Sequence, residues 1–296
     1  MSSTNNSKTP KSSKDFVMNA TLSFCSSAIS KTLVAPLERI KLLLQNQYIL
    51  NDLSVKYKGN IDCAIRVWKE QGVLSFWRGN MANVYRYAPN FALIYSLKET
   101  FKKLFAPTNN KYRNILNNIL SAAFAGVLST FVTYPLDFAR TKIGVDVGHE
   151  NQRKYKGITS CLIKYYKLEG FKGIYAGFSI TCFGAFFYRG LMFGLHDSKS
   201  KNHTLFFQYL TSVATTGISG MVLLPLDTIR RRLMVETGEK NKLYKGIFDC
   251  IRVIYKQEGF IGFSKGGYSN FIRSFGTAFT LVFNDFVVYY YKKIFK

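Results

Sequence analysis

The sequence is short of acidic residues and of histidines, and both shortages restrict its function. Asp and Glu number 17 against 41 Lys and Arg, which gives a formal net charge of +24 over 296 residues. The three histidines, His149, His196 and His203, lie in no recognisable catalytic motif. There is also no HExxH sequence, no phosphate-cradling Gly-rich lysine loop and no identifiable Ser/His/Asp arrangement. The sequence therefore does not predict an enzyme.

Cysteine is scarce as well. Five cysteines are too few for a disulfide framework, and no CxxC or Cys/His spacing suggests a metal site. Cys63, Cys161 and Cys250 each lie six residues after the Tyr of a Tyr-Lys-Gly sequence. We interpret them as small, half-buried residues on short helices, with metal binding or redox chemistry as the weaker alternative. We predict no metal and no soluble cofactor.

The first 14 residues lack two targeting features. They have neither the apolar core of a secretory signal nor the Arg-rich amphipathic helix of a transit peptide. They are rich in Ser, Asn, Thr and Lys, which predicts a short disordered tail. Any organelle address is then expected to be internal.

What the sequence does contain is a threefold repeat. A Pro-acid-base hexamer occurs at 36–41 (PLERIK), 135–140 (PLDFAR) and 225–230 (PLDTIR), after steps of 99 and 90 residues. Tyr-Lys-Gly recurs at 57–59, 155–157 and 244–246, and a Gly follows each repeat cysteine by nine residues. Landmarks in a fixed order at a fixed period indicate internal triplication. We predict a tail at 1–14 and repeats at 15–107, 108–203 and 204–296.

The basic charge is compatible with a soluble nucleic-acid-binding protein or with a membrane protein. Apolar runs favour the membrane, because they approach the ~20 residues of a spanning helix and contain small residues four apart. These runs are 16–36, 115–135, 180–196, 209–225 and 275–291. Short amphipathic helices are expected at 61–71, 158–169 and 247–258. We therefore predict an all-α membrane protein of three tandem two-helix repeats, with six spanning helices in one transmembrane domain.

The Pro-acid-base motif predicts a bend followed by a charged face. Proline inside a helix bends it, and an acid and a base three residues apart share one face. Charges at membrane depth cost at least about 2.5 to 3.5 kcal/mol and need partners. Two arrangements are open. Each pair satisfies itself within its helix, or each acid pairs with the base of the next helix and closes a ring that acts as a gate.

The sequences after the motifs resemble the mitochondrial carrier family. They read EQG and WRG at 70–72 and 77–79, EG and YAG at 169–170 and 175–177, and EG and KG at 258–259 and 265–266. The resemblance covers residues of about 15 to 293. It implies a monomeric six-helix pseudo-threefold barrel with three short matrix-side helices, working by alternating access. The Gly-containing motifs resemble the family's cardiolipin sites, so cardiolipin is an expected bound lipid.

The same resemblance assigns the gate on the matrix side. It implies three bridges, with Gln45 bracing one of them. The bridges join Glu38 to Arg140, Asp137 to Arg230, and Asp227 to Lys41.

Within the family, the sequence is most similar to the ADP/ATP carriers, whose signature is three Arg followed by three Met. Here Arg230, Arg231 and Arg232 are followed by Leu-Met-Val. The resemblance implies that Lys31, Arg86 and Arg273 hold substrate phosphates with help from Arg189, and that Gly184, Ala185 and Tyr188 line an adenine slot. Bases in otherwise apolar helices independently predict a polyanionic ligand, since guanidinium groups suit phosphate oxygens. For any one base, snorkelling to the headgroups is the alternative.

Two departures from the subfamily pattern stand out. A ladder of three tyrosines reads Tyr188, Met192 and His196, and Ile94 and Leu223 replace polar residues. The adenine end is thus altered while the phosphate end is intact.

The second departure concerns the gate on the cytoplasmic side. Its residues Glu99, Lys102, Asp197 and Asp285 are present, but Ser200 and Val288 stand where bases are expected. We therefore predict that the state closed to the cytoplasm is weakly held and that the resting carrier favours the cytoplasm-open state.

The predicted function is electrogenic exchange of ADP for ATP across the mitochondrial inner membrane, without catalytic residues. Transport of another nucleotide or phosphorylated metabolite remains open, as does a regulated proton or anion leak through the same barrel. Soluble nucleic-acid binding disagrees with the repeat and with the charge distribution.

Overall fold

The computed structural model describes residues 13–50, 55–104, 111–148, 154–185, 205–239 and 242–276, and within these ranges all regular structure is helical. The elements are α1 (Ser13–Asn46), α2 (Asn60–Gln71), the 3-10 helix η1 (Val73–Trp77), α3 (Asn80–Leu104), α4 (Lys111–Gly144), α5 (Ile158–Ile174), α7 (Leu205–Val222), α8 (Leu224–Glu236), α9 (Ile247–Glu258) and α10 (Ile261–Ser264). Two further helical stretches cover 178–185 and 267–276. The prediction of an all-α chain is confirmed for the described residues.

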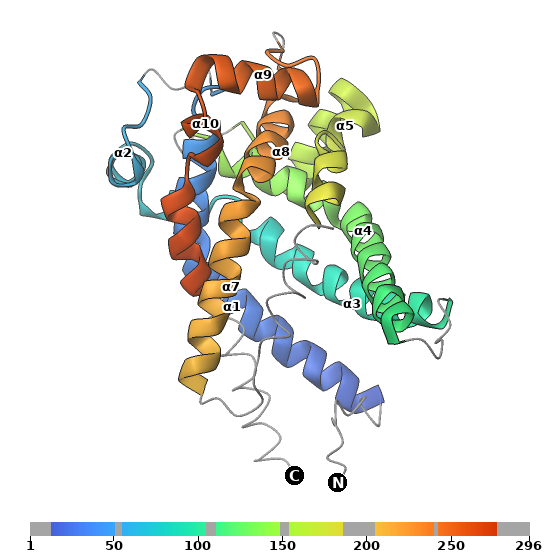
Figure 1. The fold of residues 1–296 in the computed structure, drawn as a ribbon. Coiled ribbons are helices and arrows are strands. Elements are labelled where there is room, and N and C mark those ends of the chain that lie inside the picture. Colours follow the sequence, from blue (N-terminus) through green and yellow to red (C-terminus); the bar gives the residue numbers. More distant parts are fainter. Residues whose placement is uncertain are drawn as a thin grey trace.

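The repeat is visible in the order of the helices. A long helix carrying the Pro-acid-base motif is followed by a short helix and then by a second helix that returns: α1, α2, α3, then α4, α5, 178–185, then α7 with α8, α9, 267–276. The short helices α2, α5 and α9 surround the end of the molecule at which α1, α4 and α8 terminate (Figure 1). Their bounds are close to those predicted, except that α5 runs on to Ile174 past an interruption at Gly170 (φ 64°).

The short helices are held by one buried stripe each. Residues four apart share a helix face, and the buried pairs are Cys63 with Val67, Cys161 with Tyr165, and Cys250 with Ile254. The prediction of half-buried cysteines was wrong in degree, because all three are 0% exposed. Each thiol lies in the apolar layer beneath its helix.

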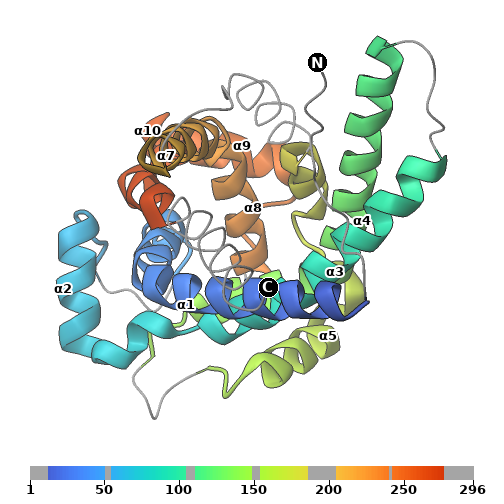
Figure 2. The same ribbon diagram turned by 90° about the horizontal axis from the view of Figure 1, so that it is seen from below.

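The long helices do not form one flat layer. Seen from below, α3 and α4 lie together at one side, α7 lies at the opposite side, and α8 lies between them (Figure 2). Helices α3 and α4 pack on each other, and α1 contacts α3, α4 and α8. Residues from α1, α4 and α8, which belong to three different repeats, are therefore brought together.

Proline in α1 leaves a carbonyl without its helical donor, and the next segment supplies one. Pro36 has no N–H to give to the carbonyl of Thr32, four residues earlier. The indole Nε1 of Trp77 in η1 donates to that oxygen at 2.8 Å. Helix α1 consequently continues through Pro36 as one helix of 34 residues.

The second repeat also supplies a side-chain donor to the carbonyl that its proline leaves free, and the third repeat has no aromatic donor at the equivalent position. Pro135 leaves the carbonyl of Phe131 without its helical N–H donor. That carbonyl accepts a hydrogen bond from the hydroxyl of Tyr175 at 3.1 Å instead. In the third repeat, Ser264 occupies the position of the aromatic residue. There the helix is divided into α7 and α8, which meet at 58° beside Pro225.

By length and apolar composition, one helix of the described ranges qualifies as a membrane span, Leu120–Gly144. The bent pair Tyr209–Val222 and Leu224–Glu236 passes the same test as a single broken span. Helices α1 and α3 carry Lys31, Glu38 and Arg86 within their length, and such charges lower the hydropathy of a helix that faces a polar interior. Most of the predicted runs at 275–291 and 180–196 lies outside the described residues.

Candidate functional site

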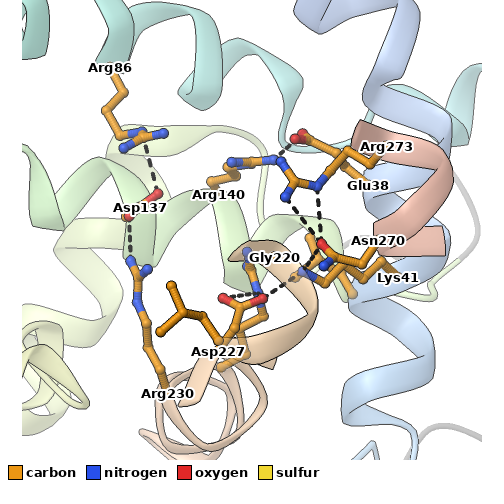
Figure 3. A pocket seen from close by; sticks show the side chains of 13 residues that line it. Glu38, Lys41, Arg86, Asp137, Arg140, Gly220, Asp227, Arg230, Asn270 and Arg273 are labelled. Atoms are coloured by element: carbon orange, nitrogen blue, oxygen red, sulfur yellow. Dashed lines mark hydrogen bonds and ion pairs between the residues drawn. The ribbon is translucent and has the colours of Figure 1, made fainter. Parts of the chain in front are cut away.

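Three ion pairs join α1, α4 and α8 into a closed ring (Figure 3). Each links the acid of one Pro-acid-base motif to the base of another. The pairs are Glu38 with Arg140, Asp137 with Arg230, and Asp227 with Lys41, the last with 2.7 Å between Oδ2 and Nζ. Of the two arrangements left open by the motif, the described residues adopt the interhelical one. We call these six residues the gate ring.

Two of the three acids in the gate ring hold a second base. Arg86 on α3 places Nε 3.4 Å from Oδ1 of Asp137. Arg231, four residues after Asp227 on α8, places Nε 3.0 Å from both of its carboxylate oxygens. Glu38 instead receives a hydrogen bond from an amide, Nδ2 of Asn83, at 3.4 Å. The same kind of ion pair therefore occurs three times in the ring, but the additional partner of the acid differs from pair to pair.

The gate ring forms one wall of a cavity of about 290 Å³. The cavity is lined by Glu38, Lys41, Leu42, Arg86, Asp137, Arg140, Gly220, Leu223, Asp227, Arg230, Arg231, Asn270 and Arg273. Six of these are bases and three are acids. A confined excess of three positive charges attracts polyanions, and guanidinium groups bind phosphate oxygens in pairs.

The structure places the three predicted phosphate-binding bases unequally. Arg86 and Arg273 line the cavity, from α3 and from 267–276. Lys31 does not line it; it lies two turns before Glu38 on α1, with Nζ 5.9 Å from the ring centre of Tyr87. Two of the three bases are thus placed together at the ring.

Of the predicted adenine slot, two residues lie in the described part of the chain. Gly184 and Ala185 end the helical stretch 178–185 and do not line the cavity, and a Cβ on Gly184 would lie 3.9 Å from Leu226. Tyr188 and Arg189 lie outside the described residues.

The cytoplasmic gate falls largely beyond the described part of the chain. Glu99 is an exposed residue of α3, and of Lys102 only the backbone position in α3 is described. Asp197 and Asp285 lie outside the described ranges.

Gln45 has a different partner from the one expected. The family resemblance implied that it braces a bridge, but its Nε2 donates to Oγ1 of Thr228 at 3.1 Å. Gln45 is fully buried, and Thr228 is the residue after Asp227. One turn beyond Lys41, the side chain reaches the neighbour of the acid rather than the ion pair itself. It therefore ties α1 to α8 below the gate ring.

The three signature arginines have three different tasks. Arg230 pairs with Asp137 in the ring, and Arg231 pairs with Asp227 within its own helix. Arg232 points away from the cavity; it is 0% exposed, pairs with Glu258 of α9 and donates to the carbonyl of Gln45 at 3.0 Å. The run of three is thus not a continuous phosphate-binding row.

Replacing Arg232 with Leu is expected to reduce stability with little effect on substrate affinity. The substitution leaves the buried carboxylate of Glu258 with Lys265 as its remaining described partner (2.7 Å), and breaking a buried pair costs about 3–5 kcal/mol. Thermal unfolding should show a lower Tm, while the KM of the surviving protein stays within about twofold. A large rise in KM at unchanged Tm would contradict this division of tasks.

Sequence reasoning missed two asparagines at the ring, Asn83 and Asn270. The signal that could have found them is positional. Each follows by four residues the Gly of an aromatic-base-Gly or Lys-Gly motif, Gly79 and Gly266. Both are 1% exposed and both contact a residue of the gate ring.

The three repeat cysteines are expected to resist alkylation in the folded protein. Burial raises the pKa of the Cys63, Cys161 and Cys250 thiols from 9.0 to about 12. Since the thiolate is the reactive form, its fraction at pH 8 falls about a thousand-fold relative to the unfolded chain. Stability should also decrease as pH rises above 9, because the unfolded thiols ionise there and the folded ones do not. Iodoacetamide labelling read by mass spectrometry checks the first point; fast labelling of all three in the native protein would contradict it.

Comparison with known proteins assigns the class. The family sequence model described as "Mitochondrial carrier protein" matches the chain three times, over residues 12–109, 111–204 and 201–295. The chain belongs to this family, and it is therefore a transport protein of the mitochondrial inner membrane that crosses the bilayer several times.

The similar curated proteins are more specific. The chain is 42% identical over 287 residues to ADP/ATP translocase 2 of Rattus norvegicus, covering 92% of this chain and 95% of that protein. It is 41% identical to ADP/ATP translocase 3 of Homo sapiens over the same shares. ADP/ATP translocase 4 of Homo sapiens is 42% identical over 271 residues, 87% of this chain and 86% of that protein.

Proposed function

We propose that this protein exchanges ADP for ATP across the mitochondrial inner membrane by alternating access. The observation that carries the proposal is the cavity beside the gate ring, in which six bases face three acids. The phosphates of a nucleoside diphosphate or triphosphate supply the negative charge that balances the excess of bases. Because ATP carries one more negative charge than ADP, the exchange is electrogenic. No covalent step is involved and no residue has a catalytic role.

The gate ring closes the matrix side of the cavity in this proposal. Six spanning helices form a pseudo-threefold barrel around the cavity, and the ring opens when the three motif helices separate. The ion pairs link different repeats, so moving the repeats apart breaks all three together. Arg86 and Arg273 receive the phosphates at the level of the ring. Lys31 lies two turns away on α1. There it binds the end of a longer phosphate chain, or a substrate that has not yet reached the ring.

We propose that cardiolipin binds at a second cavity, of about 610 Å³, between the end of α5 and the start of α9. Three bases line it, Lys172, Lys242 and Lys245, together with the acids Glu169 and Glu236, and the backbone amides near Gly177 and Gly246 with a helix N-terminus suit a phosphate group. We place the lipid headgroup there. The protein is proposed to work as a monomer, because its three repeats enclose one cavity.

Transport of another phosphorylated solute is the second candidate. Leu223 lines the main cavity at a position where the resemblance expects a small polar residue. Ile94, Met192 and His196 also differ from the subfamily pattern at positions that the resemblance assigns to the adenine end. A different base or a sugar then replaces adenine, while the phosphates bind the same arginines.

Reconstituted liposomes distinguish these possibilities. Vesicles loaded with ADP are offered labelled ATP, ADP, GTP, AMP or phosphate at equal concentration. The proposal expects ATP and ADP uptake that depends on internal nucleotide and that shifts with an imposed membrane potential. Uptake that ignores the internal nucleotide overturns strict exchange and favours a leak. Preference for another phosphorylated solute supports the second candidate.

A further inference from the structure

We infer that Asn83 and Asn270 are positioning residues that set the strength of the gate ring from the returning helices, and that Asn270 couples the ring to the substrate-binding Arg273. The inference deepens the proposed function, since it assumes that the ring is a gate beside a phosphate site. It assigns the two asparagines opposite electrostatic roles at equivalent positions of the first and third repeats.

Asn270 acts as an acceptor for two cations. Its Oδ1 accepts a hydrogen bond from Nζ of Lys41 at 2.8 Å. It also accepts hydrogen bonds from Nη2 and Nε of Arg273 at 3.1 and 3.3 Å (Figure 3). The side chain is 1% exposed, so these contacts form away from bulk water. One amide oxygen thus joins a base of the gate ring to a base of the substrate cavity.

The packing around Asn270 keeps this amide in place. Gly220 of α7 faces it, and a Cβ on Gly220 would lie 2.9 Å from Nδ2 of Asn270. Such a contact is too close, so a side chain at 220 would displace the amide of Asn270 from this position. The close packing of α7 against Asn270 therefore helps to hold Asn270 in contact with Lys41.

Asn83 acts as a donor to an acid. Its Nδ2 lies 3.4 Å from Oε2 of Glu38, the carboxylate that pairs with Arg140. It is also 1% exposed, and its buried Oδ1 has no hydrogen-bond partner among the described residues. An amide offers donors on one atom and an acceptor on the other. The same residue type therefore meets an acid of the ring in repeat one and a base of the ring in repeat three.

The second repeat lacks this device. The position four residues after its motif glycine is Thr181, whose hydroxyl donates to the carbonyl of Gly177 in its own helix at 3.0 Å. Asp137 is instead held from the returning helix of the first repeat by Arg86. The ring thus receives support from outside at each of its three acid–base pairs, by an amide at two and by a guanidinium at the third.

Coupling between substrate and gate follows from the shared oxygen of Asn270. A phosphate that binds Arg273 changes the partners of the atom that also holds Lys41. If phosphate binding draws Arg273 away from residue 270, then by linkage a stronger contact between residue 270 and Arg273 weakens phosphate binding. Asn270→Asp is the sharpest change of this kind, because it turns the shared oxygen into part of a carboxylate.

The same near-isosteric substitution at the two sites is expected to have opposite effects. Asn270→Asp places a carboxylate against Lys41 and Arg273, so Tm should rise by about 2–4 °C. Asn83→Asp places a carboxylate against that of Glu38, so Tm should fall by a similar amount. Both are measured on the purified full chain without nucleotide. Asn60→Asp is the matched control, since Asn60 lies at the start of the peripheral helix α2 and its Oδ1 already accepts a hydrogen bond from Ser269, so Tm should barely move.

Two further variants keep the test decisive. If Asn83→Asp folds poorly, adding Glu38→Gln should restore the yield, because the repelling charge is removed. Gly220→Ala should lower Tm and abolish the stabilisation by Asn270→Asp, since it displaces residue 270 from Lys41. In liposomes, Asn270→Asp should raise KM several-fold for whichever phosphorylated solute is carried.

Shifts of the same sign at 83 and 270, or no shift at either, overturn the inference. So does a failure of Glu38→Gln to rescue Asn83→Asp. These stability measurements contain no substrate, so they stand or fall separately from the proposed exchange of ADP for ATP. Absence of nucleotide exchange by the wild-type protein in liposomes would overturn that proposed function without changing the sign of the Tm shifts.

Discussion

Asp137→Asn is expected to lower stability and transport far more than Glu38→Gln. Asp137 forms ion pairs with both Arg86 and Arg230, whereas among the described residues Glu38 forms an ion pair with Arg140 and a hydrogen bond with the amide of Asn83. Removing the Asp137 carboxylate leaves two guanidinium groups in the cavity wall without their acid. Breaking a buried pair costs about 3–5 kcal/mol, and here one substitution breaks two.

The measurement is thermal unfolding together with exchange in liposomes. Asp137→Asn should lower Tm by about 5–10 °C and reduce exchange to near background, and Glu38→Gln should do roughly half as much to Tm. Equal effects of the two substitutions would show that Arg86 contributes nothing to the ring.

Charge reversal provides the matched control for this ranking. Glu38→Arg combined with Arg140→Glu exchanges the partners of a simple pair and should recover much of the lost stability. Asp137→Arg combined with Arg230→Asp should not recover, because the new arginine at 137 lies against Arg86. Recovery in both combinations would contradict the conclusion that Asp137 pairs with Arg86 as well as with Arg230.

Arg86→Gln is expected to abolish most substrate binding while leaving the fold intact. The substitution removes a guanidinium from the cavity, and hydrogen bonds to charged groups contribute about 1.5–3 kcal/mol. Substrate KM should therefore rise about 10- to 100-fold. Asp137 keeps Arg230 as its partner, so the ring remains closed. Tm should fall by a few degrees, less than for Asp137→Asn, because Asp137 loses one of its two bases and keeps the other.

A different pattern is expected for Arg230→Gln, which should lower Tm and exchange together. Arg66→Gln is the control for charge alone. Arg66 forms an exposed ion pair with Glu70 on the peripheral helix α2, and such pairs contribute at most about 1 kcal/mol. A KM change for Arg66→Gln as large as that for Arg86→Gln would mean that net charge, and not position, governs binding.

Much of the gate could be read from the sequence because the triplication constrains it. Equal spacing places an acid and a base on the same face after each proline, and three equivalent helices meeting at one point offer each acid the base of a neighbour. The bounds of α2 and α9 follow from that pattern, and the three bridges follow from the family resemblance. The pattern did not reveal that the helix is divided beside Pro225 while α1 and α4 continue through Pro36 and Pro135, because the donors of Trp77 and Tyr175 come from another segment.

The tertiary structure decided what lies around each bridge. The sequence presents Arg230, Arg231 and Arg232 as one run, but successive residues on a helix point about 100° apart, so one reaches Asp137, one Asp227 and one Glu258.

Periodic spacing was thus enough to reveal the repeat and the all-helical class, while the pairing of the gate ring was implied by the family resemblance and is seen in the ion pairs. The contacts of Gln45 with Thr228, of Arg86 with Asp137 and of Asn270 with Lys41 and Arg273 became apparent in three dimensions alone. These contacts depend on the rotation and closeness of helices from different repeats. Local periodicity does not encode that geometry.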